Sequence, residues 1–250
     1  MNGRQDLKTS GGMHISGGEY NDVRVSGALK VDGTLDCETL HASGAVKVAG
    51  DLHCAGRLAA SGAVKVEGSV SGGSIGTSGA LVAGRELTVQ GELRSSGSVS
   101  CTGKLQADSL KTSGSCQCGG DVHVRELVSS GRLMVDGGVE AERFSSTGKV
   151  EIRGLLNAEE IDLRICADNT VGDIGGSKIT VRKDWVGISF HKPRLTVKSI
   201  EGDTVELELT KAEVVRARFI HIGPGCEITR VEYTEDLTIE GGTVTEQVKV

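Results

Sequence analysis

One stretch of the sequence decides the fold: Gly27-Ala-Leu-Lys-Val-Asp-Gly-Thr-Leu-Asp-Cys-Glu-Thr-Leu-His-Ala-Ser43. Its apolar residues alternate with polar ones in three short pairs, which are Leu29 and Val31, Leu35 and Cys37, and Leu40 and Ala42. Alternation with a period of two indicates a β-strand with one buried face. Glycine or short polar residues lie between the pairs and favour turns. We therefore expect three short strands from this stretch, with one face of each turned inward.

The same unit recurs over more than half of the chain, marked at a nearly constant interval by a Ser-Gly or Thr-Gly dipeptide. The recurring glycines are Gly27, Gly44, Gly62, Gly79, Gly97, Gly114, Gly131 and Gly148. A fixed short period is typical of solenoids, in which each unit buries its apolar face against the next one. The sequence therefore predicts an all-β fold, a parallel β-helix of triangular cross-section with about 17–18 residues in each turn, or rung.

Composition agrees with a narrow interior and a structural class of protein. Only 2 % of the 250 residues are aromatic, whereas 37 are glycine and 2 are proline. The net charge of −6 does not favour nucleic acid as a partner. No apolar run reaches the length of a membrane span, and the first residues do not resemble a signal peptide. We expect a cytoplasmic protein whose seven cysteines are reduced.

The repeat divides the chain into four parts. Residues 1–26 are expected to form an N-terminal segment and a degenerate first rung, and residues 27–164 eight regular rungs. Residues 165–201 break the pattern and predict an irregular insertion or a distorted rung, with strand-like segments at 179–181 and 186–188 beside Trp185. Residues 202–250 are interpreted as further rungs; a small separate β-domain is the alternative. Their expected inward columns, which keep one constant spacing, are Val205, Ile222 and Ile239, and Val214, Val231 and Val248.

Neither end of the predicted coil carries a recognisable cap. An open rung exposes unpaired backbone groups beside apolar side chains, so it favours pairing with a second copy. A tail that folds over the end is the alternative. The expected self-assembly interface is Ile15, Val23, Val25, Leu237, Ile239, Val244 and Val248.

Repeats of the form Gly-x-Val-x-Val-x-Gly-x-Leu-x-Ala/Cys in a chain poor in aromatics resemble the bactofilins, the polymer-forming cytoskeletal proteins of bacteria. Three C-terminal runs are similar to longer Gram-positive members of that family: Ala212-Glu-Val-Val-Arg-Ala-Arg, Ile222-Gly-Pro-Gly-Cys-Glu-Ile and Val231-Glu-Tyr. The resemblance covers most of residues 11–250. It departs from the family in the length of the coil and in residues 1–7, which do not match the apolar membrane anchor of many bactofilins.

The resemblance implies a right-handed β-helix that polymerises end to end without nucleotide and organises cell-wall, cell-shape or motility machinery. The implied partners are further copies of the chain and proteins of the cell envelope or motility apparatus. Membrane contact, if it occurs, is expected to be peripheral and at the cytoplasmic face.

Five cysteines fall at inward positions, and two pairs stack in adjacent rungs, Cys37 on Cys54 and Cys101 on Cys118. A disulfide between stacked cysteines is geometrically conceivable. We favour the interpretation that these cysteines are small buried hydrophobes. Cys116 and Cys118 are not spaced as a zinc motif, and we expect no metal and no cofactor.

Other chemistry-bearing residues do not predict an active site. No histidine is expected to lie in a His/Asp/Ser or His/Glu constellation, and the outward column Lys30, Lys47 and Lys65 is interpreted as a solvated face. A left-handed hexapeptide-repeat acyltransferase is the enzyme alternative, but its repeat is matched only at 222–228. A carbohydrate-processing β-helix would need aromatic sugar platforms, and a β-helical adaptor that does not polymerise stays open. We expect no enzyme activity and no catalytic residues.

Overall fold

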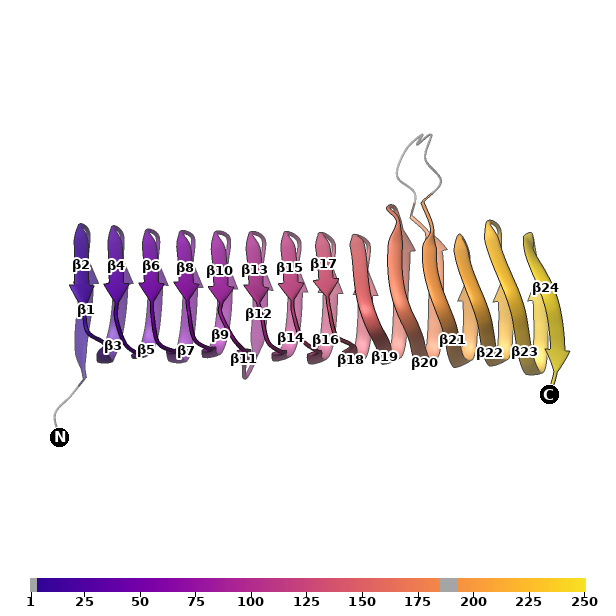
Figure 1. Cartoon of the computed structure of the whole chain (residues 1–250), viewed down its shortest axis with the longest axis horizontal. Coiled ribbons are helices and arrows are strands. Elements are labelled where there is room, and N and C mark those ends of the chain that lie inside the picture. The colour runs from indigo at the N-terminus through magenta and orange to yellow at the C-terminus, as the bar shows by residue number, and fades with distance from the viewer. Residues whose placement is uncertain (1–3, 185–192) are drawn as a thin grey trace. The chain divides into compact units, whose positions relative to one another are not determined.

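The computed structural model describes residues 4–184 and 193–250. These residues form strands and the turns that connect them, and contain no helix. The strands pair in parallel and stack as a β-solenoid, which confirms the predicted parallel β-helix (Figure 1). The chain divides into two compact units, Met1–His123 (unit 1) and Val124–Val250 (unit 2).

Unit 1 consists of short strands, most of which have four or eight residues. In its repeating rung, a four-residue strand such as β4 is followed by an eight-residue strand such as β5. Each pairs with its counterpart one rung before and one rung after, so that β2, β4, β6 and β8 lie side by side (Figure 1). The strands are β1 (Gln5–Thr9), β2 (Gly12–Ile15), β3 (Gly18–Val25), β4 (Ala28–Val31), β5 (Leu35–Ala42), β6 (Ala45–Val48), β7 (Leu52–Ala60), β8 (Ala63–Val66), β9 (Val70–Thr77), β10 (Ala80–Ala83), β11 (Leu87–Val89), β12 (Glu92–Ser95), β13 (Ser98–Cys101), β14 (Leu105–Thr112), β15 (Ser115–Cys118) and the beginning of β16 (Val122–Ser129).

The predicted inward pairs are confirmed. Leu29, Val31, Leu35, Cys37, Leu40 and Ala42 are each at most 2 % exposed. Burying large aliphatic side chains stabilises the fold by roughly 1.5–3 kcal/mol each, so stacking supplies most of the stability. The second and third predicted strands of a rung are one strand, β5, because its ladder with β3 continues on both sides of the corner at Glu38 and Thr39.

The glycine of each Ser-Gly dipeptide is required by vertical stacking. A Cβ added to Gly44, Gly62 or Gly79 would collide with the carbonyl oxygen of the corresponding glycine one rung before. None of these three glycines has a positive φ. Glycine therefore recurs at this position because two corners lie too close together for a side chain, and not because the backbone needs an unusual conformation.

One inward column of unit 1 changes from apolar to polar, which the sequence analysis did not anticipate. Ala42 and Ala60 are followed in register by Thr77, Ser95 and Thr112. The hydroxyl oxygens of Thr77, Ser95 and Thr112 are buried and have no hydrogen-bond partner among the described residues. An unsatisfied buried hydroxyl costs about 1–3 kcal/mol, so this column weakens the core locally.

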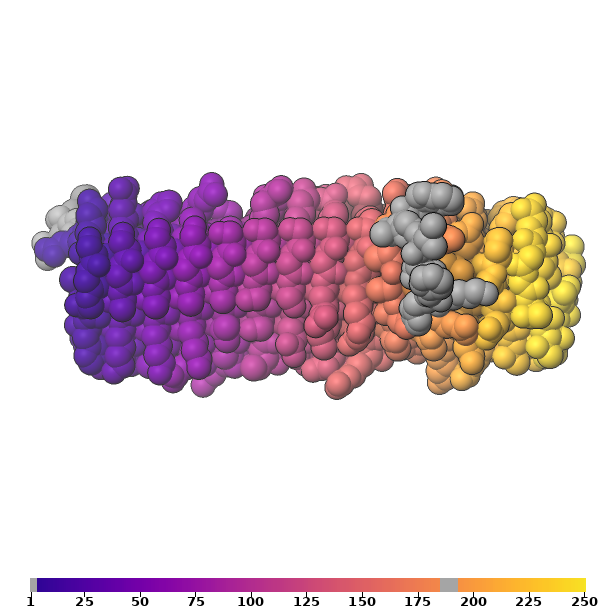
Figure 2. Space-filling view, turned by 90° about the horizontal axis from the view of Figure 1, so that it is seen from above, coloured from indigo at the N-terminus to yellow at the C-terminus, as the bar shows by residue number. Residues whose placement is uncertain are grey.

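Strands in unit 2 become longer toward the C-terminus. From β19 onward a single strand runs through all the inward pairs of a rung. Figure 2 shows one face of the molecule, and the regular rows of atoms in it lie over the rungs of unit 1 (indigo to magenta). The strands are β17 (Arg132–Val135), β18 (Val139–Ser146), β19 (Lys149–Ile165), β20 (Asn169–Lys183), β21 (Leu195–Leu207), β22 (Thr210–Ile222), β23 (Cys226–Ile239) and β24 (Gly242–Lys249).

The rungs that begin with β21 are shorter than those of unit 1 because their corners are shorter. Two residues separate Leu207 from Thr210, whereas three separate the equivalent Ala42 from Val46. Leu195 therefore pairs with Thr210, which is a shorter step along the chain than the step from Leu29 to Val46 in unit 1. The tight corner forces a left-handed backbone on Leu209, with φ of 51°.

The expected columns of constant spacing in 202–250 are accordingly wrong in part. Val205 pairs with Ile220 and Val231 with Val215, whereas Ile222 does pair with Ile239 as expected. The spacing fails wherever a shortened corner lies between two rungs.

The stretch 165–201 contains strand pairing that the weak repeat concealed. Residues 179–181 lie in β20, which pairs in parallel with β19 and β21. Asn169 pairs with Leu195, so this rung contains extra chain between Lys183 and Leu195. Trp185 and the expected strand at 186–188 lie outside the described residues.

Candidate functional site

The strands β1 and β2 form the N-terminal edge of unit 1. Ile15 lies in β2 opposite Val31 and is partly exposed. Val23 and Val25 are buried, because β1 covers them with Leu7 and Thr9. These two valines therefore lie one strand inside the edge, whereas the expected interface placed them at the edge itself. The sequence analysis missed β1 because it contains a single apolar side chain, Leu7.

The outer strand of unit 2 is β24, together with the end of β23. Leu237 and Ile239 pair with the buried Ile220 and Ile222, and Ile239 is 37 % exposed. Val244 continues the inward column of Ile228.

Val248 differs from the other expected interface residues of this edge. Its partner in register is Glu232, which faces outward because the neighbouring Val231 is inward and fully buried. Register instead places Gln247 and Lys249 at the inward positions of β24, and the Lys249 amine donates to the carbonyl oxygen of Glu235 at 3.3 Å. Val248 therefore does not belong to the apolar edge.

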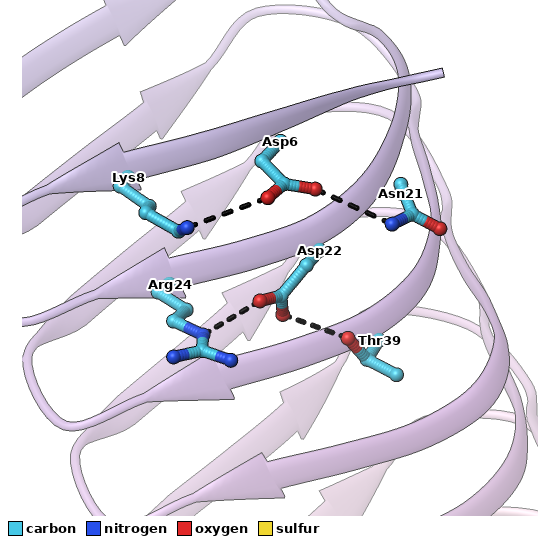
Figure 3. Close-up of polar contacts among 6 residues, drawn as sticks. All are labelled: Asp6, Lys8, Asn21, Asp22, Arg24 and Thr39. Atoms are coloured by element: carbon cyan, nitrogen blue, oxygen red, sulfur yellow. Dashed lines mark hydrogen bonds and ion pairs between the residues drawn. The ribbon is translucent and has the colours of Figure 1, made fainter. Parts of the chain in front are cut away.

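The outward face near β1 carries carboxylates that join neighbouring rungs. The Asp6 carboxylate accepts hydrogen bonds from Asn21 and Lys8, both at 3.3 Å (Figure 3). One rung further on, Asp22 accepts from Thr39 at 2.8 Å and Arg24 at 2.6 Å. Each carboxylate thus contacts a basic side chain (Lys8 or Arg24) of its own strand and a polar side chain (Asn21 or Thr39) of the next rung.

These hydrogen bonds favour the ionised carboxylates. Asn21, followed by Lys8, lowers the pKa of Asp6 below its usual value. The Thr39 hydroxyl, followed by Arg24, lowers the pKa of Asp22. Exposed ion pairs contribute little to stability individually, so this surface is best understood as many weak links between rungs.

Acidic side chains beside the column of Lys30, Lys47 and Lys65 offset part of its positive charge. Lys30 Nζ lies 3.0 Å from an Asp32 oxygen, and Lys47 Nζ lies 3.1 Å from a Glu67 oxygen. The side chains of both ion pairs are about half exposed. The arrangement agrees with a solvated face more than with a basic groove.

The expectation that no histidine lies in a His/Asp/Ser or His/Glu constellation is wrong for His221, and two further histidines contact one acid or one serine each. His14 contacts Asp32 at 2.7 Å, His221 lies 3.6 Å from Glu240, and His53 Nδ1 lies 2.7 Å from Ser71 Oγ. The partners come from neighbouring rungs in each case, so they meet only after the rungs stack.

His53 and Ser71 have the spacing of a base and a nucleophile. Asp36 occupies the same outward column, one rung before His53. Within the described part of the chain, the Asp36 carboxylate makes no hydrogen bond to His53. A base that no third group orients lacks part of the arrangement that activates a serine.

The predicted stacking of cysteines is present. Cys37 pairs with Cys54 in register, and Cys101 with Cys118. All seven cysteines are free, and only Cys166 is exposed. Residues 4–184 and 193–250 contain no group of three or more metal-ligating side chains placed to hold an ion.

The hexapeptide-like run at 222–228 is a corner between two strands. Ile222 ends β22 and Cys226 begins β23, and both are buried. Gly225 takes a left-handed backbone with φ of 75°.

None of the residues that the structure describes form a helix that could span a membrane.

Comparison with known proteins identifies two relatives in Bacillus subtilis (strain 168). The uncharacterized protein YhbF is 45 % identical over 78 residues, which are 31 % of this chain and 33 % of YhbF. The uncharacterized protein YhbE is 35 % identical over 89 residues, which are 34 % of this chain and 38 % of YhbE. The matched segments therefore span no more than 38 % of either relative. No family model and no solved structure matches the chain.

Proposed function

We propose that the protein is a non-enzymatic structural scaffold of the bactofilin kind, which assembles end to end without nucleotide. A parallel β-solenoid fits a scaffold or repeat protein, because its interior is filled by side chains and its function lies on outer surfaces and edges. The proposed setting is the cytoplasm, with cell-wall, cell-shape or motility proteins as further partners. The resemblance of the repeat to bactofilins supports this setting.

The edge at β24 is the observation that carries the proposal. Among the described residues, β24 pairs with β23 alone, so its other side has backbone donors and acceptors without a strand partner. Ile239 and Val244 lie at inward positions of this edge and remain partly exposed. A second copy that pairs there would extend the hydrogen-bond ladder and cover both side chains.

Electron microscopy and light scattering of the purified chain without nucleotide test the proposal. We expect filaments or multi-copy chains from the natural protein, and shorter assemblies from Ile239→Arg and Val244→Arg. Val248→Arg is the matched control, because it adds the same charge to the same edge on an outward position. A monomer at all concentrations would overturn self-assembly, and equal shortening by Val248→Arg would overturn the role of the inward positions.

An adaptor that presents outward columns to partner proteins is the second candidate. It is favoured by the cross-rung polar contacts of Figure 3, which hold outward side chains in a regular row. A stable monomer that retains its fold would support this candidate over the scaffold.

A further inference from the structure

We propose that Cys37 and Cys54 are a cross-rung disulfide site that small disulfide oxidants close, and that the equally stacked Cys101 and Cys118 react more slowly. The two pairs have the same register relationship but different surroundings. The proposal concerns a covalent modification of the coil and does not depend on end-to-end assembly.

The geometry of Cys37 and Cys54 permits a bond between them. They are direct partners in the β5–β7 ladder, and the Cys54 thiol donates to the carbonyl oxygen of Glu38, the residue after Cys37, at 3.5 Å. Paired strands lie about 4.8 Å apart, which is within the Cα separation that a disulfide spans. Closing the bridge would therefore need movement of the two side chains and little movement of the backbone.

A hollow lies beside this pair. Its volume is about 200 Å³, and Cys37 and Cys54 are among the residues that line it. The next position in their inward column is Gly72, which also lines the hollow and carries no side chain. The other lining residues are Arg4, Asp36, His53, Ala55, Ser71, Gly73, Thr88 and Gln90.

The backbone beside the pair is also less regular. The β5–β7 register shifts directly after Cys37, and the β7–β9 register shifts directly after Cys54. An interrupted ladder opens locally at a lower free-energy cost than a continuous one. Both features increase the access of a small oxidant.

Cys101 and Cys118 lack this irregularity. Their sulfur atoms are 3.5 Å apart, and β13 pairs with β15 without a register shift. All four cysteines are buried, so the two pairs differ in the hollow and in the regularity of the ladder, and not in their static exposure. Because the two cysteines of each pair are direct partners in register, a difference in oxidation rate between the pairs reports access.

The reaction with oxidised glutathione balances in two exchange steps. The Cys54 thiolate attacks one sulfur of glutathione disulfide, forms a mixed disulfide and releases one glutathione thiolate. The Cys37 thiolate then attacks the Cys54 sulfur and releases the second glutathione. The protein loses two electrons and two protons, and glutathione disulfide is reduced to two thiols. The hydrogen bond from Cys37 lowers the pKa of the Cys54 thiol, which favours Cys54 as the attacking group.

Timed oxidation of the full chain, followed by alkylation, trypsin digestion and mass spectrometry, tests the proposal. Cleavage after lysine and arginine separates Cys37 and Cys54 into the peptides 31–47 and 48–57, and Cys101 and Cys118 into 95–104 and 112–125. We expect the 31–47 peptide linked to the 48–57 peptide to accumulate first. A faster link between 95–104 and 112–125, or no link in either pair, would overturn the proposal.

Two variants separate access from chemistry. In Cys37→Ala, we expect Cys54 to retain one glutathione because no resolving thiol remains. In Gly72→Ala, the added Cβ would lie 3.2 Å from Ile75 Cγ1 and 3.5 Å from the Cys54 carbonyl oxygen, so it fills the inward position next to Cys54 and closure of the disulfide should slow severalfold. Cys101→Ala is the control and should leave the rate at Cys37 and Cys54 unchanged. An unchanged rate in Gly72→Ala would show that the missing side chain at Gly72 does not contribute to access.

Discussion

The rungs of β4 to β8 and the rungs of β21 and β22 are of the same kind but have different corners. In the first region, three residues including a glycine connect Ala42 to Val46, and that glycine stacks against the glycine of the rung before, as Gly148 also does over Gly131 in unit 2. In the second region, Glu208 and Leu209 alone connect Leu207 to Thr210, and Leu209 adopts a positive φ. The inward pairs and the parallel ladder are retained in both units.

The difference shows that the inward side chains define a rung. The recurring glycine depends only on the length of the corner between two strands. A three-residue corner stacks backbone on backbone and excludes Cβ. A two-residue corner avoids that stacking but requires a strained backbone, which costs a non-glycine residue roughly 1–2 kcal/mol. A fixed period is therefore a property of one kind of corner. The fold itself tolerates rungs of different length, as the steps from Leu195 to Thr210 and from Leu40 to Leu58 show.

The largest effect should come from filling a stacked corner of unit 1. In Gly62→Val, the Cβ would collide with the carbonyl oxygen of Gly44, and the rungs would have to separate. We expect the free energy of unfolding to fall by about 3 kcal/mol or more, measured by guanidinium denaturation with circular dichroism. Gly76→Ala is the control, because its Cβ would meet only the Arg57 guanidinium, at 3.8 Å, and should change stability by less than about 0.5 kcal/mol. Equal loss in the two variants would refute the role of corner stacking.

A smaller effect should appear at the tight corner of unit 2. Leu209→Gly relieves the positive φ, whereas Leu209→Ala removes the same side chain and keeps the strain. We expect the glycine variant to be more stable than the alanine variant by about 1 kcal/mol in the same denaturation experiment. The opposite order would mean that the corner relaxes in solution and that the comparison between corners does not hold.

The smallest effect concerns the outward carboxylates, which occur in both units. The folded state holds the pKa of Asp22 below its usual value of 3.8, so its contribution to stability is complete above about pH 4 and is lost as the pH falls further. Asp22→Asn should therefore reduce the loss of stability between pH 6 and pH 3. Glu232→Gln provides the same test in unit 2, where Arg216 and then Arg230 lower the pKa of Glu232. Unchanged pH profiles in both variants would contradict these links between rungs.

Much of the fold was predictable because each rung repeats a local pattern. Alternation at Leu29 and Val31 determines which face is buried, and the recurring Ser-Gly dipeptide determines the period. The register of 202–250 was not predictable from spacing, because a two-residue corner at Leu209 has no glycine to mark it. The polar column of Thr77, Ser95 and Thr112 could have been found by aligning the residue before each Ser-Gly dipeptide.

The candidate surfaces were less predictable, because they depend on contacts between residues a whole rung apart. His53 meets Ser71, and Asp22 meets Thr39, only through stacking. Val23 and Val25 were expected at the edge because the strand that covers them, β1, has a weak apolar pattern. Val248 was expected at the apolar edge because a constant spacing was extended past the shorter corners.

The strands β6 and β8 have the same sequence, Ala-Val-Lys-Val, in consecutive rungs. A chain that pairs β4 with β8 by mistake would loop out one rung and still place valines opposite Leu29 and Val31, as in the correct state. The looped-out rung leaves its own inward side chains exposed, so the slipped state is less stable than the correct one and acts as a kinetic trap during folding. The looped-out rung is also available to a neighbouring molecule, and we expect concentrated refolding to yield strand-exchanged aggregates. The regularity that makes this fold easy to recognise therefore makes its correct register hard for the chain itself to find.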